Sequence, residues 1–136
     1  MTIKDLNSAE FDEYYARYIN KLPETLDLRT GFLDGKESTI NFFRAIPEEK
    51  LTYRYAPDKW TVKEVLQHLI DTERIFTYRM FRIARRDKTP LAPFDQNIYV
   101  QPSGANKKGL EQLLDEYEKV RNGTIALIES ISDEDI

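Results

Sequence analysis

The stretch WTVKEVLQHLIDTERIF, residues 60–76, specifies a helix more clearly than any other part of the chain and contains its single histidine, His68. Thr61 and Glu64 form a T-x-x-E capping box, in which each side chain satisfies a free backbone amide of the first helical turn. The helical pattern continues until two prolines in DKTPLAPFD, residues 87–95, end it. We therefore predict a helix that begins near Thr61 and is followed by an ordered loop.

Successive residues of an α-helix are rotated by about 100° around its axis, and this rotation divides the predicted helix into two faces. The face expected to pack in the core consists of Val62, Val65, Leu66, Leu69, Phe76, Met80, Ile83 and Ala84. The face expected to meet solvent consists of Lys63, Glu64, Gln67, Asp71, Arg74, Tyr78, Arg82 and Arg85. Ile70 and Ile75 widen the apolar arc, which indicates more than one neighbouring helix.

Two more long helices are predicted from apolar residues at steps of three and four. The later one contains Leu110, Leu113, Leu114, Tyr117, Val120, Thr124, Leu127, Ile128 and Ile131. In the earlier one, Pro23 suits the first turn, Pro47 ends the pattern, and the apolar residues are Leu26, Leu33, Ile40 and Phe43. Phe11, Tyr14, Tyr15 and Tyr18 predict a short N-terminal helix, with its rings on one side, docked on the others.

The composition favours one intracellular domain. No strand-like alternation or internal repeat competes with the helices, so we expect a single all-α domain over residues 1–136. The chain has no cysteine for a disulfide or a thiolate zinc site. It has neither a signal-like start nor a run of about 18 apolar residues, which predicts a cytoplasmic protein without a membrane partner.

A cluster of basic residues raises nucleic-acid binding as a further hypothesis. It consists of Arg79, Arg82, Arg85, Arg86 and Lys88. Cations at this position complement the C-terminal end of a helix. Since the net charge is −4 and no aromatic residues interleave on that face, we expect no nucleic-acid partner.

Two charged residues interrupt the apolar stripes. Glu73 falls near the centre of the stripe in the second long helix, and Arg121 near the centre of the stripe in the third. A lone buried charge is costly, so the two are expected to pair. The pair would either fix the register of the two helices or line a ligand pocket.

His68 lies on the shoulder of its helix, on the same side as Thr72 and Arg79. A neutral imidazole is a good ligand for zinc, nickel or iron, but a catalytic zinc normally takes three protein ligands. The chain offers no second histidine. Spacing alone therefore favours a hydrogen-bonded histidine at a helix seam over a metal ligand.

The segment KWTVKEVLQHLIDTERIFTYRMFRIARRDKTPLAPFDQNIYV, residues 59–100, resembles the DinB-like (YfiT-like) helical family. The YEKVR segment around Arg121 extends the likeness weakly. Members of that family are four-helix bundles in which a histidine of an HL(I/V)D-type motif in the second helix binds a divalent metal. Two histidines from an HxxxH motif of the last helix complete that site. His68 in QHLID corresponds to the first ligand, so the resemblance implies that it binds zinc or nickel.

The sequence departs from the family at its C-terminus. It ends at ISDEDI, where a family member continues into the helix with the other two histidines. We therefore expect three main helices, a last helix that is missing or truncated, and an incomplete metal site. Such a bundle would expose an apolar groove, which predicts a homo-oligomer.

The resemblance also implies a function. Family members act as metal-dependent hydrolases or as transferases that use a low-molecular-weight thiol, such as bacillithiol or mycothiol, as cosubstrate. The substrate would be a small electrophilic molecule, His68 the metal ligand, and Thr72, Arg79 and Asp95 candidates for the pocket. The alternative is a non-catalytic helical scaffold or stress-associated binding protein, which the missing ligands favour.

Overall fold

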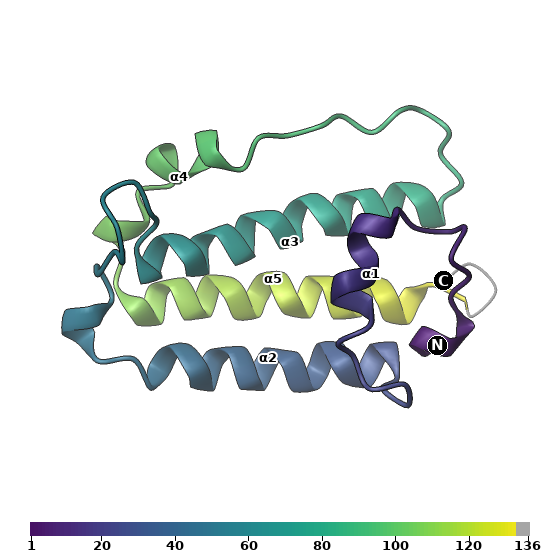
Figure 1. Ribbon diagram of the computed structural model, residues 1–136, viewed down its shortest axis with the longest axis horizontal. Coiled ribbons are helices and arrows are strands. Elements are labelled where there is room, and N and C mark those ends of the chain that lie inside the picture. The colour runs from purple at the N-terminus through teal and green to yellow at the C-terminus, as the bar shows by residue number, and fades with distance from the viewer. Residues whose placement is uncertain (133–136) are drawn as a thin grey trace.

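Three long helices run side by side in the computed structural model, which describes residues 1–132 (Figure 1). They are α2 (Leu28–Arg44), α3 (Val62–Ala84) and α5 (Leu110–Ser130). Two short α-helices, α1 (Glu13–Ile19) and α4 (Asn97–Ser103), accompany three 3-10 turns, η1 (Ile3–Asp5), η2 (Glu48–Lys50) and η3 (Ala105–Lys107). The described residues contain no strand, so the predicted all-α class is confirmed. None of the described helices is long and apolar enough to cross a lipid bilayer.

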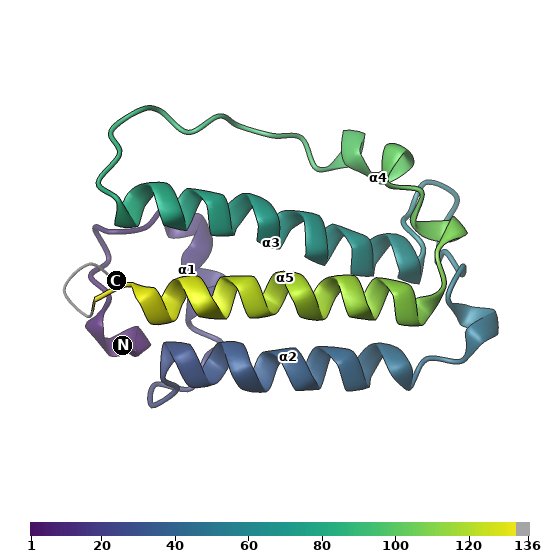
Figure 2. The same cartoon turned by 180° about the vertical axis from the view of Figure 1, so that it is seen from behind.

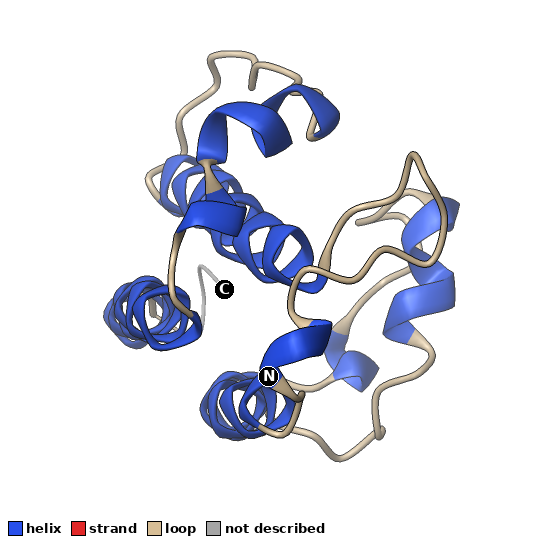
Figure 3. Cartoon of the chain, turned by 90° about the vertical axis from the view of Figure 1, so that its left-hand side faces the viewer, coloured by secondary structure: helices blue, strands red, loops and turns tan. Residues whose placement is uncertain are grey.

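Helix α5 is the central element of the arrangement. It packs against both α3 and α2, and an end-on view shows the three helices as an arc with α5 in the middle (Figure 3). Helices α3 and α5 point in the same direction and α2 in the opposite one (Figures 1 and 2). After α3 the chain therefore returns along the length of that helix, as an extended segment that leads into α4 (Figure 2).

The core lies where α2, α3 and α5 meet. It is formed by Ile40 and Phe43 of α2, Leu66 and Ile70 of α3, and Leu113, Leu114 and Tyr117 of α5. Leu66, Ile70 and Leu113 are completely buried. Burying one such side chain contributes about 1.5–3 kcal/mol, so this cluster is the main source of stability.

Helix α3 begins as its capping box predicts. The hydroxyl of Thr61 accepts a hydrogen bond from the amide of Glu64 at 3.1 Å, and the carboxylate of Glu64 accepts one from the amide of Thr61 at 2.7 Å. The helix ends at Ala84, before the proline-containing segment 87–95, which is a loop. These local signals placed both ends of α3 correctly.

The predicted faces of α3 are partly wrong, because the helix is rotated relative to its apolar pattern. Val65, Leu69, Phe76 and Ile83, predicted to lie in the core, are 39–64% exposed. Lys63, Glu64 and Gln67, predicted to meet solvent, are buried.

The buried polar groups of α3 have partners from the segment just before α5. Lys63 donates to the carbonyl of Lys108 at 2.8 Å, and Lys108 donates in turn to the side-chain oxygen of Gln67 at 2.6 Å. The side chain of Asn106 donates to Glu64 at 2.9 Å. Because buried polar groups are tolerated when hydrogen-bonded, these contacts allow the polar side of α3 to face inward.

Two predictions for the N-terminal part need correction. Helix α2 begins at Leu28 rather than near Pro23, because Asp27 caps it by accepting from the amide of Arg29 at 3.0 Å. Helix α1 exists, but its aromatic side does not dock. Tyr14, Tyr15 and Tyr18 are 44–55% exposed, and Phe11 precedes the helix.

Two of the exposed tyrosines of α1, Tyr14 and Tyr18, pack on a cation instead. The guanidinium of Arg17 lies 3.9 Å from the ring centre of Tyr14 and 4.9 Å from that of Tyr18. The guanidinium lies on the ring faces while the phenolic hydroxyls stay in water. Such cation–π contacts give the rings a favourable interaction outside the core.

Candidate functional site

His68 lies in the second turn of α3, and its ring is fixed by two neighbours. The indole of Trp60, just before the helix, packs on it with 4.7 Å between ring centres and 51° between planes. One turn after His68, the hydroxyl of Thr72 lies 3.2 Å from its Nδ1 atom. The i and i+4 positions share a helix face, which brings the hydroxyl to the ring.

The surroundings of His68 favour its neutral form. Desolvation by burial lowers the pKa of His68 below its usual value of 6.5, and the nearby Asp71 carboxylate opposes this shift only in part. A neutral imidazole keeps one nitrogen lone pair. When Nδ1–H donates to Thr72, that lone pair is on Nε2, where it can bind a metal or accept a proton.

A small cavity adjoins His68. Its lining comes from α3 and from the segment that folds back over α3, and consists of Glu64, Gln67, His68, Asp71, Thr72, Phe94, Gln96, Tyr99, Val100 and Ser103. Its volume of about 10 Å³ is close to that of one water molecule. A substrate larger than a water molecule does not fit into this cavity as it stands.

Of the three predicted pocket residues, only Thr72 lies with His68. Arg79 donates to the carbonyl of Ala92 at 2.8 Å and fixes the returning loop to α3. Asp95 lies two residues before α4 and accepts a hydrogen bond from the amide of Asn97 at 2.9 Å. Neither Arg79 nor Asp95 lines the small cavity.

Trp60 and Tyr99 lie next to His68 or line its cavity, and neither is among the site candidates predicted from the sequence. Trp60 precedes the N-cap of α3, and its ring reaches His68 in the second turn of that helix. Tyr99 comes from α4, and helical periodicity within α3 contains no information on where α4 lies. No signal in the sequence could have placed that residue.

Glu73 and Arg121, which the stripe analysis predicted to pair, lie together between α3 and α5. Arg121 Nη2 is 2.9 Å from Glu73 Oε2, and the two side chains are 19% and 10% exposed. The guanidinium also lies 4.8 Å from the ring centre of Phe32 in α2. Because neither residue lines the cavity at His68, the pair is separate from that site.

A divalent metal is the cofactor that the family resemblance implies, and the described residues fit it only in part. His68 suits one ligand position, since a partner on Nδ1 is what orients metal-binding imidazoles. Residues 1–132 contain no group of three or more His, Cys, Asp or Glu side chains that could hold a metal ion. These residues therefore supply one ligand and not a complete set.

The protonation of His68 is directly measurable, because it is the chain's single histidine. We expect its NMR titration midpoint to lie below 6.5 in the folded protein and near 6.5 in urea. Because the unfolded chain binds a proton on His68 more readily than the folded chain, protonation of His68 favours unfolding. The contribution of the neutral ring to the free energy of unfolding is fully present above pH 6.5 and is lost as the pH falls through the folded-state pKa. The variant His68→Gln should show a weaker pH dependence of unfolding in this range. A folded-state midpoint above 6.5 would contradict the burial of a neutral ring.

Comparison with known proteins gives one match. The family model of the DinB superfamily matches residues 33–136, and the predicted resemblance is confirmed. No curated protein and no solved structure matches the chain. Because the match spans most of the chain, including all of α3 and α5, this protein belongs to the DinB superfamily.

Proposed function

We propose that the protein acts on a small electrophilic molecule as a metal-dependent hydrolase or as a transferase of a low-molecular-weight thiol. The observation that carries this proposal is the setting of His68, which lines a cavity and contacts Thr72 through Nδ1, while burial lowers the pKa of its ring. A bound divalent cation, zinc or nickel, would stabilise a deprotonated thiol or water. Its other ligands would come from groups outside residues 1–132 or from a second copy.

The chain's own residues would have distinct roles at this site. Thr72 holds the imidazole in one orientation, and Trp60 covers one face of the ring. Phe94 and Tyr99 line the cavity from the returning segment, and the space that remains holds about one water molecule. In a site with little water, electrostatic interactions with reacting groups are stronger than in bulk solvent.

A second candidate is a non-catalytic binding protein or scaffold. The incomplete ligand set among the described residues favours it. In that case Thr72 and Trp60 only satisfy and cover a histidine at the seam between α3 and the returning segment.

Metal content separates the two candidates. The protein would be incubated with zinc or nickel and dialysed, and the metal per chain determined by elemental mass spectrometry. If the protein is the proposed enzyme, the wild type should retain about one metal ion per chain and His68→Gln should retain none. Thr72→Val, which lacks the orienting hydroxyl, should bind the metal about 10–100-fold more weakly. Consumption of a small thiol such as L-cysteine in the presence of an electrophile would be measured on the same samples. If wild type and His68→Gln retain the same amount of metal, the enzyme proposal is wrong and the non-catalytic binding protein remains.

We also propose that the protein is a cytoplasmic homo-oligomer. The support for association is the row of exposed apolar side chains on α3, formed by Val65, Leu69, Phe76 and Ile83. Exposed apolar surface of this kind is commonly covered by association. Light scattering at increasing concentration tests it, and a monomer throughout would contradict it.

A further inference from the structure

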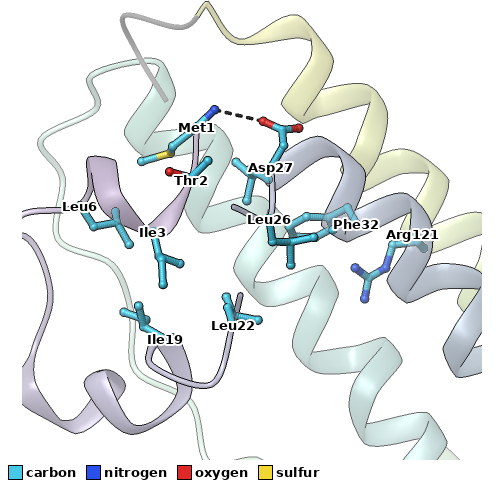
Figure 4. A pocket seen from close by; sticks show the side chains of 12 residues that line it. Met1, Thr2, Ile3, Leu6, Ile19, Leu22, Leu26, Asp27, Phe32 and Arg121 are labelled. Atoms are coloured by element: carbon cyan, nitrogen blue, oxygen red, sulfur yellow. Dashed lines mark hydrogen bonds and ion pairs between the residues drawn. The ribbon is translucent and has the colours of Figure 1, made fainter. Parts of the chain in front are cut away.

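A second and larger cavity lies away from His68, between the N-terminal segment and the helices α2 and α5 (Figure 4). Its volume is about 300 Å³, which is at the lower end of the range of roughly 300–1,000 Å³ for small-molecule sites. The lining is mostly apolar and includes Ile3, Leu6, Ile19, Leu22, Leu26 and Phe32. Such a cavity favours an apolar occupant over water.

The charged groups that line this cavity are each paired. The N-terminal amine of Met1 lies 3.1 Å from the Asp27 carboxylate at one side. At the other side, Arg121 pairs with Glu73 at 2.9 Å through Nη2. An anionic ligand would meet no uncompensated cation and would approach two carboxylates. A neutral oxygen could still accept a hydrogen bond from the guanidinium, which has five N–H donors.

We propose that this cavity binds a neutral, elongated apolar molecule with one hydrogen-bond-accepting oxygen, such as a medium-chain alcohol or ketone. The hydrocarbon part lies among the leucine and isoleucine side chains of the N-terminal segment, and the oxygen lies at Arg121. The site is independent of the metal-dependent function proposed for His68, since the two cavities share no residue.

Gly31 keeps part of this cavity open. A Cβ atom at this position would lie 3.3 Å from Cδ2 of Leu26, so a larger side chain must displace Leu26 or enter the cavity. Gly35, one turn later on the same helix, has no atom within 4 Å of the corresponding point. The two glycines therefore offer a matched pair of positions for filling the cavity and for leaving it unchanged.

The test measures calorimetric binding of 1-alkanols from six to ten carbons to the full chain with a free Met1 amine. We expect saturable binding of one molecule per chain, with affinity rising about fourfold per methylene until the cavity is filled. The carboxylate of equal length should bind more weakly at pH 7. Absence of saturable binding, or a carboxylate that binds as tightly as the alcohol, would overturn the proposal.

Variants locate the binding. Gly31→Leu should lower the affinity at least tenfold, whereas Gly35→Leu should stay within twofold of wild type. If Gly31→Leu does not fold, Leu22→Trp takes its place with Leu33→Trp as control, since both leucines are nearly half exposed and only Leu22 lines the cavity. Equal affinities within a pair would overturn the assignment.

Two further controls distinguish alkanol binding in this cavity from metal binding at His68 and from association of the chain. His68→Gln should leave alkanol affinity within twofold of wild type, so a failed metal experiment leaves this result unaffected. The protein could also form a dimer at high concentration. If the alkanol affinity falls over the same range of protein concentration in which the dimer forms, a second copy occupies the cavity, and the small-molecule proposal is overturned.

Discussion

Replacing Arg121 with methionine should lower the free energy of unfolding by roughly 3–5 kcal/mol. The substitution keeps much of the side-chain volume but leaves the carboxylate of Glu73, only 10% exposed, without its cation. An uncompensated buried charge is the costly state, and the cost far exceeds the net contribution of the intact pair. Urea titration followed by circular dichroism measures the change. For a domain of this size it corresponds to a melting temperature roughly 10–20 °C lower.

The double variant Glu73→Leu/Arg121→Met is the control for this experiment. With both charges removed, most of the lost stability should return, because an apolar pair of similar volume needs no desolvation of ions. The wild-type pair is not fully satisfied, since Glu73 Oε1 and Arg121 Nε are buried without a hydrogen-bond partner. A single Arg121→Met variant within about 0.5 kcal/mol of wild type would show that Glu73 is solvated.

Leu66→Ala should cost about 2–5 kcal/mol, and Leu69→Ala less than about 1 kcal/mol. Both leucines belong to the same apolar stripe of the sequence, but Leu66 is completely buried and Leu69 is 39% exposed. The first substitution leaves a void between α3 and α5, and the second removes a side chain that water already reaches in part. Parallel urea titrations of the two variants compare the costs.

The same pair of variants also tests whether the side of α3 that carries Leu69 is exposed to solvent or covered by another copy of the chain. A large cost at Leu69 in dilute protein would contradict the orientation in which that side of α3 meets solvent. A cost that appears only as concentration increases would instead indicate that Leu69 is buried between copies, since oligomer stability depends on protomer concentration.

Features set by neighbouring residues could be predicted from the sequence. The capping box fixed the start of α3, and the prolines at 90 and 93 marked the loop after it, because both act through local backbone geometry. The orientation of α3 could not be predicted in this way. It depends on Asn106 and Lys108, which satisfy buried polar groups of α3 from a distant part of the chain.

The same distinction holds for the candidate site. The contact of His68 with Thr72 follows from their spacing of four residues on one helix. Phe94 and Tyr99 reach the cavity because the chain returns along α3, a feature of topology that no periodicity within a helix contains. The large cavity beneath the N-terminal segment was missed for the same reason, since its lining comes from three separate parts of the chain.

The central position of α5 has a consequence for synthesis on the ribosome. Helices α2 and α3 emerge first, but α5 supplies Leu113, Leu114 and Tyr117 to the core that joins them. Until α5 leaves the exit tunnel, the apolar residues of the two earlier helices lack most of their native neighbours. The nascent chain should therefore stay open to chaperones and proteases until α5 has emerged, and should become compact in a single step after that.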